Sequence, residues 1–125
     1  MRYSLLLNNP EPADAGITEE DMAPFREAFD AYAKSLNAAG ILVAAEILKS
    51  AEMTTTVTLR TGTLSIQDGP FADTKEKLAG AFVIDVPDLD EALAWASKCP
   101  GAQYGVIEIR PSAISFREGQ WQELG

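Results

Sequence analysis

The fold is decided by DGPFADTKEKLAGAFVIDVPD, which spans residues 68–88. An Asp-Gly-Pro sequence is typical of a turn, and Asp73 and Glu76 have the spacing of a capping box for one helical turn. The apolar residues that follow predict a strand from Gly80 to Val86. Asp88 then has the place of a helix N-cap. The buried stripe of that helix is expected to consist of Leu89, Ala92, Leu93 and Ala96.

The residues before this stretch predict a strand, a helix and a second strand. Residues 2–8 alternate as in a strand, and residues 41–48 continue as one after Gly40. Between them, large apolar residues recur at helical spacing. They are Met22, Phe25, Phe29, Tyr32 and Leu36. Because Pro24 would lie too deep in a helix that starts at Thr18, we expect a separate turn first and a helix from about Asp21.

Residues 54–59 and 63–66 are rich in β-branched side chains and flank Arg60-Thr61-Gly62, a pattern that predicts a tight hairpin inserted outside the core. Gly62 is expected to have a positive φ. A last strand is predicted over residues 104–110. Without the hairpin, the order is strand, helix, strand, strand, helix, strand. This order predicts an α+β fold, a ferredoxin-like βαββαβ sheet with an inserted β-hairpin and both helices on one face.

Both faces of this sheet carry apolar residues. In the strand at 81–86, Phe82, Ile84 and Val86 lie on one face, whereas Ala81 and Val83 lie on the other. Two helices on one side cannot cover both faces. We therefore predict that the helix-free face packs on a second copy of the chain, which gives a homodimer built sheet to sheet.

The domain is expected to span residues 1–110, with residues 111–125 as a C-terminal extension. Ile114 and Phe116 alternate with polar residues as in an edge strand. Two interpretations stay open for this extension. It lies across the partner chain, or it is a loosely docked terminus.

Composition limits the function classes. A chain of 125 residues fits one domain. Ten Lys and Arg against nineteen Asp and Glu give a net charge of −9, which disfavours direct nucleic-acid binding. Cys99 is the single cysteine, so no intrachain disulfide is possible. We find no signal sequence or membrane-spanning run, and expect a cytoplasmic protein without membrane contact.

The absence of histidine removes Ser-His-Asp and Cys-His catalytic systems and the commonest metal ligand. No G-x-G-x-x-G, Walker A, Cys-x-x-Cys or His-Glu-x-x-His motif is present. We therefore expect no cofactor and no metal. Cys99 is expected to pack as an ordinary small side chain.

Two carboxylates are candidate catalytic residues. Asp68 stands at the mouth of a turn, where it would act as a general base or bind a cationic group. The competing interpretation is that it hydrogen-bonds its own backbone and holds the turn. Asp85 shares a strand face with Ala81 and Val83, so it is expected to point into the space between two copies.

A ligand cleft at that dimer interface is predicted around the candidate carboxylates. Its other expected residues are Tyr3, Ser4, Glu46, Glu108 and Arg110. The alternatives are surface ion pairs between Glu108 and Arg110 or between Asp85 and Arg2, and an exposed edge position for Glu46.

The Asp68-Gly69-Pro70-Phe71 turn, with the strand and acidic-capped helix after it, resembles the DGPF branch of the YCII-related family over roughly residues 1–110. The resemblance implies a dimeric α+β barrel. In the shorter branch of the family a histidine is paired with an aspartate, and this chain has no residue for the histidine role.

Two functions of different classes follow. The first is a homodimer with a small-molecule cleft at its interface which, if it is an enzyme, uses carboxylate acid/base chemistry. The second comes from the resemblance, because related proteins are often encoded beside extracytoplasmic-function sigma factors. It is an accessory regulatory module that contacts a sigma factor without contacting DNA.

Overall fold

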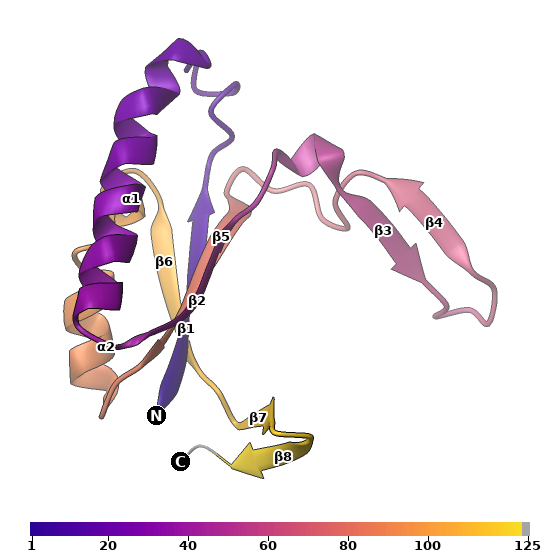
Figure 1. Cartoon of the computed structure of the whole chain (residues 1–125). Helices are drawn as coiled ribbons and strands as arrows, with labels where there is room; N and C mark the ends of the chain where they lie inside the picture. Colours follow the sequence, from indigo (N-terminus) through magenta and orange to yellow (C-terminus); the bar gives the residue numbers. More distant parts are fainter. Residues whose placement is uncertain (124–125) are drawn as a thin grey trace.

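Four antiparallel strands in the order β2-β5-β1-β6 form the central sheet of the computed structural model, which describes residues 1–123 (Figure 1). The strands are β1 (Arg2–Asn9), β2 (Leu42–Ile47), β5 (Lys77–Asp85) and β6 (Val106–Pro111). Two helices, α1 (Ala23–Ala38) and α2 (Leu89–Ala96), lie on one side of the sheet (Figure 1). This order and helix placement confirm the predicted ferredoxin-like α+β fold.

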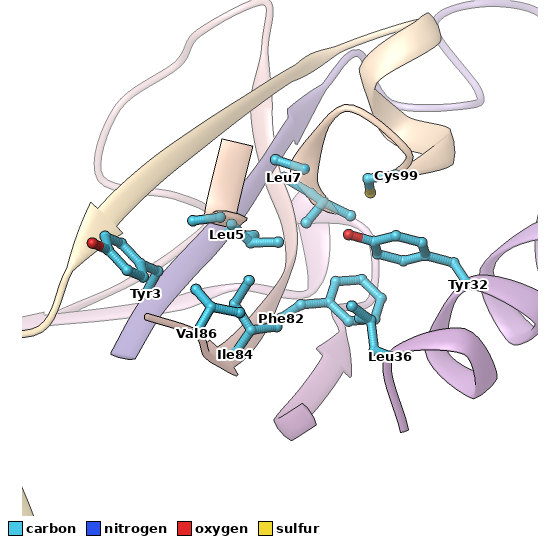
Figure 2. Close-up of a cluster of buried hydrophobic side chains, with 11 residues drawn as sticks. Tyr3, Leu5, Leu7, Tyr32, Leu36, Phe82, Ile84, Val86 and Cys99 are labelled. Carbon is cyan, nitrogen blue, oxygen red and sulfur yellow. The ribbon is translucent and has the colours of Figure 1, made fainter. Parts of the chain in front are cut away.

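The core lies between the sheet and the helices. Alternation along β1 and β5 sends every second side chain toward α1 and α2. Eleven apolar residues of the described part of the chain are buried there. Figure 2 draws this cluster as sticks and labels Tyr3, Leu5, Leu7, Tyr32, Leu36, Phe82, Ile84, Val86 and Cys99. The Tyr32 ring meets the Phe82 ring edge to face at 5.2 Å. The Tyr32 hydroxyl donates to the Trp95 carbonyl at 2.8 Å, so its polar end is satisfied.

The first helix begins as the proline predicts. A 3₁₀ turn, η1 (Glu20–Met22), precedes α1, and Pro24 occupies the first turn of α1, where no backbone N–H is needed. The Thr18 hydroxyl donates to the Asp21 carboxylate at 2.8 Å. Past the end of α1, Gly40 has φ +72°, the left-handed conformation that ends many helices.

The second helix differs from the predicted stripe. Asp88 caps it as expected, because its carboxylate accepts from the Glu91 N–H at 2.9 Å. Ala92 and Ala96 are buried, but Leu89 and Leu93 are 55% and 57% exposed. Small side chains let the helix lie close to the sheet, so the alanines face the core and the leucines do not.

The predicted helical turn at Asp73–Glu76 is wrong. Residues 69–76 form bends and irregular segments without a helical turn, and Asp73 instead pairs with the Lys77 ammonium at 3.3 Å. Strand β5 begins at Lys77, three residues before Gly80, because Lys77 and Leu78 pair with Asn9 and Asn8 beyond an irregularity in the register. Long-range pairing with β1 therefore prevails over the local capping pattern.

Two hairpins lie outside the main sheet. β3 (Thr55–Thr58) and β4 (Ser65–Asp68) form the inserted hairpin, called the arm below, and Gly62 at its turn has φ +83°. β7 (Ile114–Arg117) and β8 (Gln120–Glu123) form the tail hairpin. Both hairpins project from the sheet on the side opposite the helices (Figure 1).

The remaining elements are short. They are two 3₁₀ turns, η2 (Ala51–Met53) and η3 (Pro100–Gln103). The predicted strand at Ile114–Phe116 exists, but it pairs within the tail hairpin and not with the main sheet. Residues 124–125 of the predicted extension lie outside the described residues.

None of the helices formed by residues 1–123 has both the length and the hydropathy required to span a membrane.

Candidate functional site

The helix-free face of the sheet collects most of the predicted cleft residues. Ser4 lies between Val83 on β5 and Arg110 on β6, and Leu6 lies between Ala81 and Glu108. On β2, Ala44 lies opposite Val83, and Glu46 opposite Ala81. Asp85 pairs in register with Arg2 at the end of the same face. The centre of this face therefore alternates small apolar and polar side chains.

The charged groups of this face do not form the surface ion pairs that the sequence suggested, and they have other partners. The Met1 amino group lies 3.4 Å from the Asp85 carboxylate, and Asn8 Nδ2 donates to Glu108 Oε1 at 3.1 Å. Arg2 donates to the Ser115 hydroxyl at 3.2 Å, which ties β1 to the tail hairpin. Among residues 1–123, neither Asp85–Arg2 nor Glu108–Arg110 forms an ion pair.

Tyr3 lies away from this face. It is 3% exposed and belongs to the core, because it alternates with Ser4 and points toward the helices. Its hydroxyl approaches Met1 Sδ at 3.6 Å.

Asp68 also lies away from this face, at the end of β4, where it is exposed and opposite Thr55. The next residue has φ +96°, a conformation that favours glycine, and its N–H donates to the Thr54 carbonyl at 2.7 Å. The Asp-Gly turn thus closes the base of the arm. Within the part of the chain that the structure describes, no hydrogen bond or ion pair joins Asp68 to Asp85.

The main cavity is a groove on the other face, between α1 and the sheet edge at β2, with a volume of about 1210 Å³. It exists because α1 leaves the helix-facing side of β2 uncovered, so that Ala45 and Ile47 are exposed there. Most of its wall is apolar. The apolar lining includes Ile17, Met22, Phe25, Phe29, Ala33, Ala45, Ile47, Leu48, Met53, Leu78 and Phe82.

Sequence reasoning missed this groove, although it contained a signal. The apolar stripe of α1 starts ten residues before Tyr32, at Met22, yet only Tyr32 and Leu36 are buried. The earlier members, Phe25 and Phe29, are half-buried and line the groove. The apolar stripe is thus longer than its buried part, and this excess length is the signal in the sequence that indicates the groove.

Two of the cations that line the groove are paired with carboxylates. The Lys77 ammonium contacts the Asp73 carboxylate and the Thr74 carbonyl, and the Lys77 side chain is 18% exposed. Arg26 pairs with Glu19 at 2.6 Å. The lining contains five carboxylates against three cations, a net charge of −2.

Tyr104 forms part of the groove wall, with its ring 5.3 Å from that of Phe25. Burial raises the pKa of the Tyr104 phenol, so the hydroxyl stays protonated at neutral pH and offers a hydrogen-bond donor.

The described residues offer neither a metal cluster nor an activated thiol. No three His, Cys, Asp or Glu side chains among them are arranged to hold a metal ion. Cys99 is 1% exposed, and burial raises the pKa of its thiol. A buried, protonated thiol is a poor nucleophile.

Comparison with known proteins gives one family and one curated relative. The model of the YCII-related domain matches residues 1–113. The chain is 35% identical over 125 residues to an uncharacterized protein of Rhizobium meliloti (strain 1021), and the alignment covers 96% of this chain and 98% of that protein.

Proposed function

The chain belongs to the YCII-related family, and from this premise we propose that it is a homodimeric small-molecule-binding protein whose ligand enters the groove between α1 and β2. The observation that carries the proposal is the groove itself. Ligand sites are concave, largely apolar and usually hold a few polar groups, and this groove has each of these properties. We also propose, from the Asp68–Phe71 turn, that the chain belongs to the DGPF branch of this family.

The groove defines a class of ligand. Its volume of about 1210 Å³ is above the range of about 300–1,000 Å³ that is usual for small-molecule sites, so it admits a drug-sized organic molecule. Its aromatic and aliphatic wall favours an apolar body. Its net charge of −2, within a chain of charge −9, disfavours anions. We therefore infer that the ligand is a largely apolar molecule with a neutral or cationic polar group.

The homodimer is supported by the amount of exposed surface. The chain exposes 8636 Å², whereas a compact monomer of 13.5 kDa exposes roughly 6,500 Å². The excess is about 2,100 Å² per chain, and a dimer that covered it would bury about 4,200 Å² in total, within the range of obligate homodimers.

The helix-free face is the favoured location of this interface. Apart from the tail hairpin, which Arg2 holds at one end of this face, no element formed by residues 1–123 covers it in Figure 1. The tail hairpin supports the same location, because its polar Ser115 is held by Arg2 while its apolar face is exposed. The apolar residues of that face are Ile114, Phe116 and Trp121, at 50%, 57% and 65% exposure, and Glu123 lies opposite Ile114. We infer that the extension packs on the partner subunit, and that Ser4, Glu46, Asp85, Glu108 and Arg110 lie at or beside the contact.

Catalysis is not part of this proposal. Neither Asp68 nor Asp85 lines the groove, and both are exposed in the single chain. The alternative function is regulation through contact with a sigma factor. Only the acidic charge of the chain is compatible with it, and it stays a prediction that comes from the family resemblance. A pull-down with the dimer as bait that recovers a sigma factor would favour it.

Neighbouring alanines on β2 provide the test. Ala45 lines the groove, and Ala44 points to the helix-free face. We expect Ala45→Trp to fill the groove and Ala44→Trp to add the same ring on the dimer side. Both positions are exposed, so neither substitution disturbs the core.

The probes are 2-phenylethylamine, 2-phenylethanol and phenylacetate, which share a body and differ in charge. Titration followed by amide NMR is expected to shift groove resonances most with the amine and least with the carboxylate. Ala45→Trp should abolish these shifts and keep the dimer, whereas Ala44→Trp should keep the shifts and weaken the dimer. Shifts that survive Ala45→Trp, or no shifts in the wild type with any probe, would contradict the binding proposal.

A further inference from the structure

The arm has one apolar face and one polar face. Val57 lies directly opposite Ile66 in its register, and Leu59 and Leu64 follow two residues away in the sequence, just beyond the paired residues. These four side chains are 55–63% exposed. The other face consists of Thr56, Thr58, Ser65 and Gln67. We call the first set, Val57, Leu59, Leu64 and Ile66, the apolar row.

A two-stranded sheet that exposes such an apolar row to water is not expected to be stable without a partner. An isolated hairpin is marginally stable at best, and a contiguous exposed apolar patch usually marks an interaction surface. The base of the arm is nevertheless well ordered by hydrogen bonds. The Gly69 N–H donates to the Thr54 carbonyl at 2.7 Å, and the Thr56 hydroxyl donates to the Gly69 carbonyl at 2.7 Å. The arm is therefore held out from the sheet with its row uncovered.

We propose that the apolar row of the arm of one protomer packs on the partner subunit, an inference that rests on the homodimer proposed above. Position favours a second copy as the occupant, because the arm projects to the helix-free side, where the partner is expected (Figure 1). Area favours it as well, since the arm contributes to the excess surface of about 2,100 Å².

Charge does not oppose a second copy as the occupant. The arm contains Arg60 and Asp68, whose charges cancel, whereas the rest of the chain carries −9. An arm without net charge meets less repulsion from the acidic body of another copy than an acidic segment would. Arg60 also lies 5.6 Å over the ring of Phe71, which is 75% exposed and adds to the apolar surface beside the arm.

Docking of the arm also gives a position to Asp68, which does not line the groove. Asp68 lies two residues beyond Ile66 and therefore ends the apolar row on the same face. The packed arm carries the Asp68 carboxylate to the boundary between the two subunits. The carboxylate that the sequence marks as a candidate thus belongs to one chain and faces the other.

The two faces of the arm provide matched variants. Val57→Asp and Ile66→Asp place a charge in the apolar row, whereas Ser65→Asp and Gln67→Asp place the same charge on the polar face, one residue before and one residue after Ile66. Sedimentation equilibrium of the full chain is expected to show the dimer weakened by about 100-fold or more in the row variants. The polar-face variants should differ from the wild type by about threefold or less. The core is untouched in all four, and circular dichroism checks the fold.

Hydrogen exchange of the wild type gives a second measurement that needs no substitution. Arm amides should be protected at concentrations where the dimer forms and should exchange rapidly when dilution dissociates it. Row variants that dimerise like the wild type, or arm amides whose protection does not change on dilution, would overturn the arm proposal and leave the homodimer standing. A wild type that is monomeric at every concentration would overturn both, while the groove titration would still report on ligand binding.

Discussion

Val83→Asp is expected to convert the proposed dimer into folded monomers. Val83 is half-buried at the centre of the helix-free face, between Ser4 on β1 and Ala44 on β2. In a single chain the new carboxylate reaches water, and the cost to the monomer is about 1 kcal/mol or less, the span of strand propensities. In the proposed dimer, the partner subunit would cover the same carboxylate and exclude water from it.

The effect on association follows from burial and symmetry. An unpaired carboxylate in a dry interface costs about 3 kcal/mol or more. A twofold interface contains the substitution twice, so the two copies together cost about 6 kcal/mol. The dissociation constant should therefore rise by about 10⁴-fold.

Sedimentation equilibrium measures this change directly. The control is Ala45→Asp, which adds the same charge to the opposite face of the same sheet, and its dissociation constant should change by about threefold or less. Thermal unfolding of Val83→Asp at high dilution should match that of the dissociated wild type. If Val83→Asp and Ala45→Asp dimerise equally well, the helix-free face is not the interface and the reasoning fails.

Three further predictions concern the single chain. Asp88→Ala removes the cap of α2, whose hydrogen bond is 2.9 Å long, and should lower the free energy of unfolding by about 1 kcal/mol, as urea titration would show. Gly105→Ala should lower it by about 3 kcal/mol or prevent folding, since the new Cβ would lie 2.4 Å from the carbonyl oxygen of Asn8; a wild-type midpoint would contradict this. Burial raises the pKa of Cys99 from 9.0 and of Tyr32 from 10.0, so the neutral forms favour folding: their contribution is full below pH 9.0 and is lost as the pH rises further. Stability measured up to about pH 11 should fall less steeply in the Tyr32→Phe variant, and an unchanged slope would be evidence against the role of burial.

The sequence was sufficient for the sheet and its two faces. Alternation along β1 separates the two faces of the strand, because successive side chains point in opposite directions, and Leu5 and Leu7 lie in the core on one of them. Tyr3 lies in the core on the same face, although it was expected in the ligand cleft. The same logic predicted Phe82 and Ile84 on the helix side. Local turn chemistry was also reliable where glycine was required, as at Gly62.

Features that depend on tertiary contacts could not be predicted from the sequence. The capping spacing of Asp73 and Glu76 is a local signal, and the pairing of Lys77 with Asn9 across the sheet replaced it. Helical periodicity identified the stripe of α1, but a buried Leu36 and a groove-lining Phe25 look alike in the sequence, because both positions are apolar. Whether an apolar position faces a core or a cavity depends on how far the helix stands from the sheet.

Part of the arrangement of the candidate residues could be predicted from the sequence. Register places Ser4, Glu108 and Arg110 as neighbours, which follows from strand order. The groove was missed, since its wall combines α1, β2 and loops distant in sequence. Asp68 lies in the arm, and no sequence pattern fixes the direction in which an inserted hairpin projects.

The most direct test is the mass of the wild-type particle in solution, from sedimentation equilibrium at micromolar concentration. A second copy on the helix-free face requires twice 13.5 kDa, about 27 kDa. A compact, folded particle of 13.5 kDa that persists as the concentration rises would contradict the account.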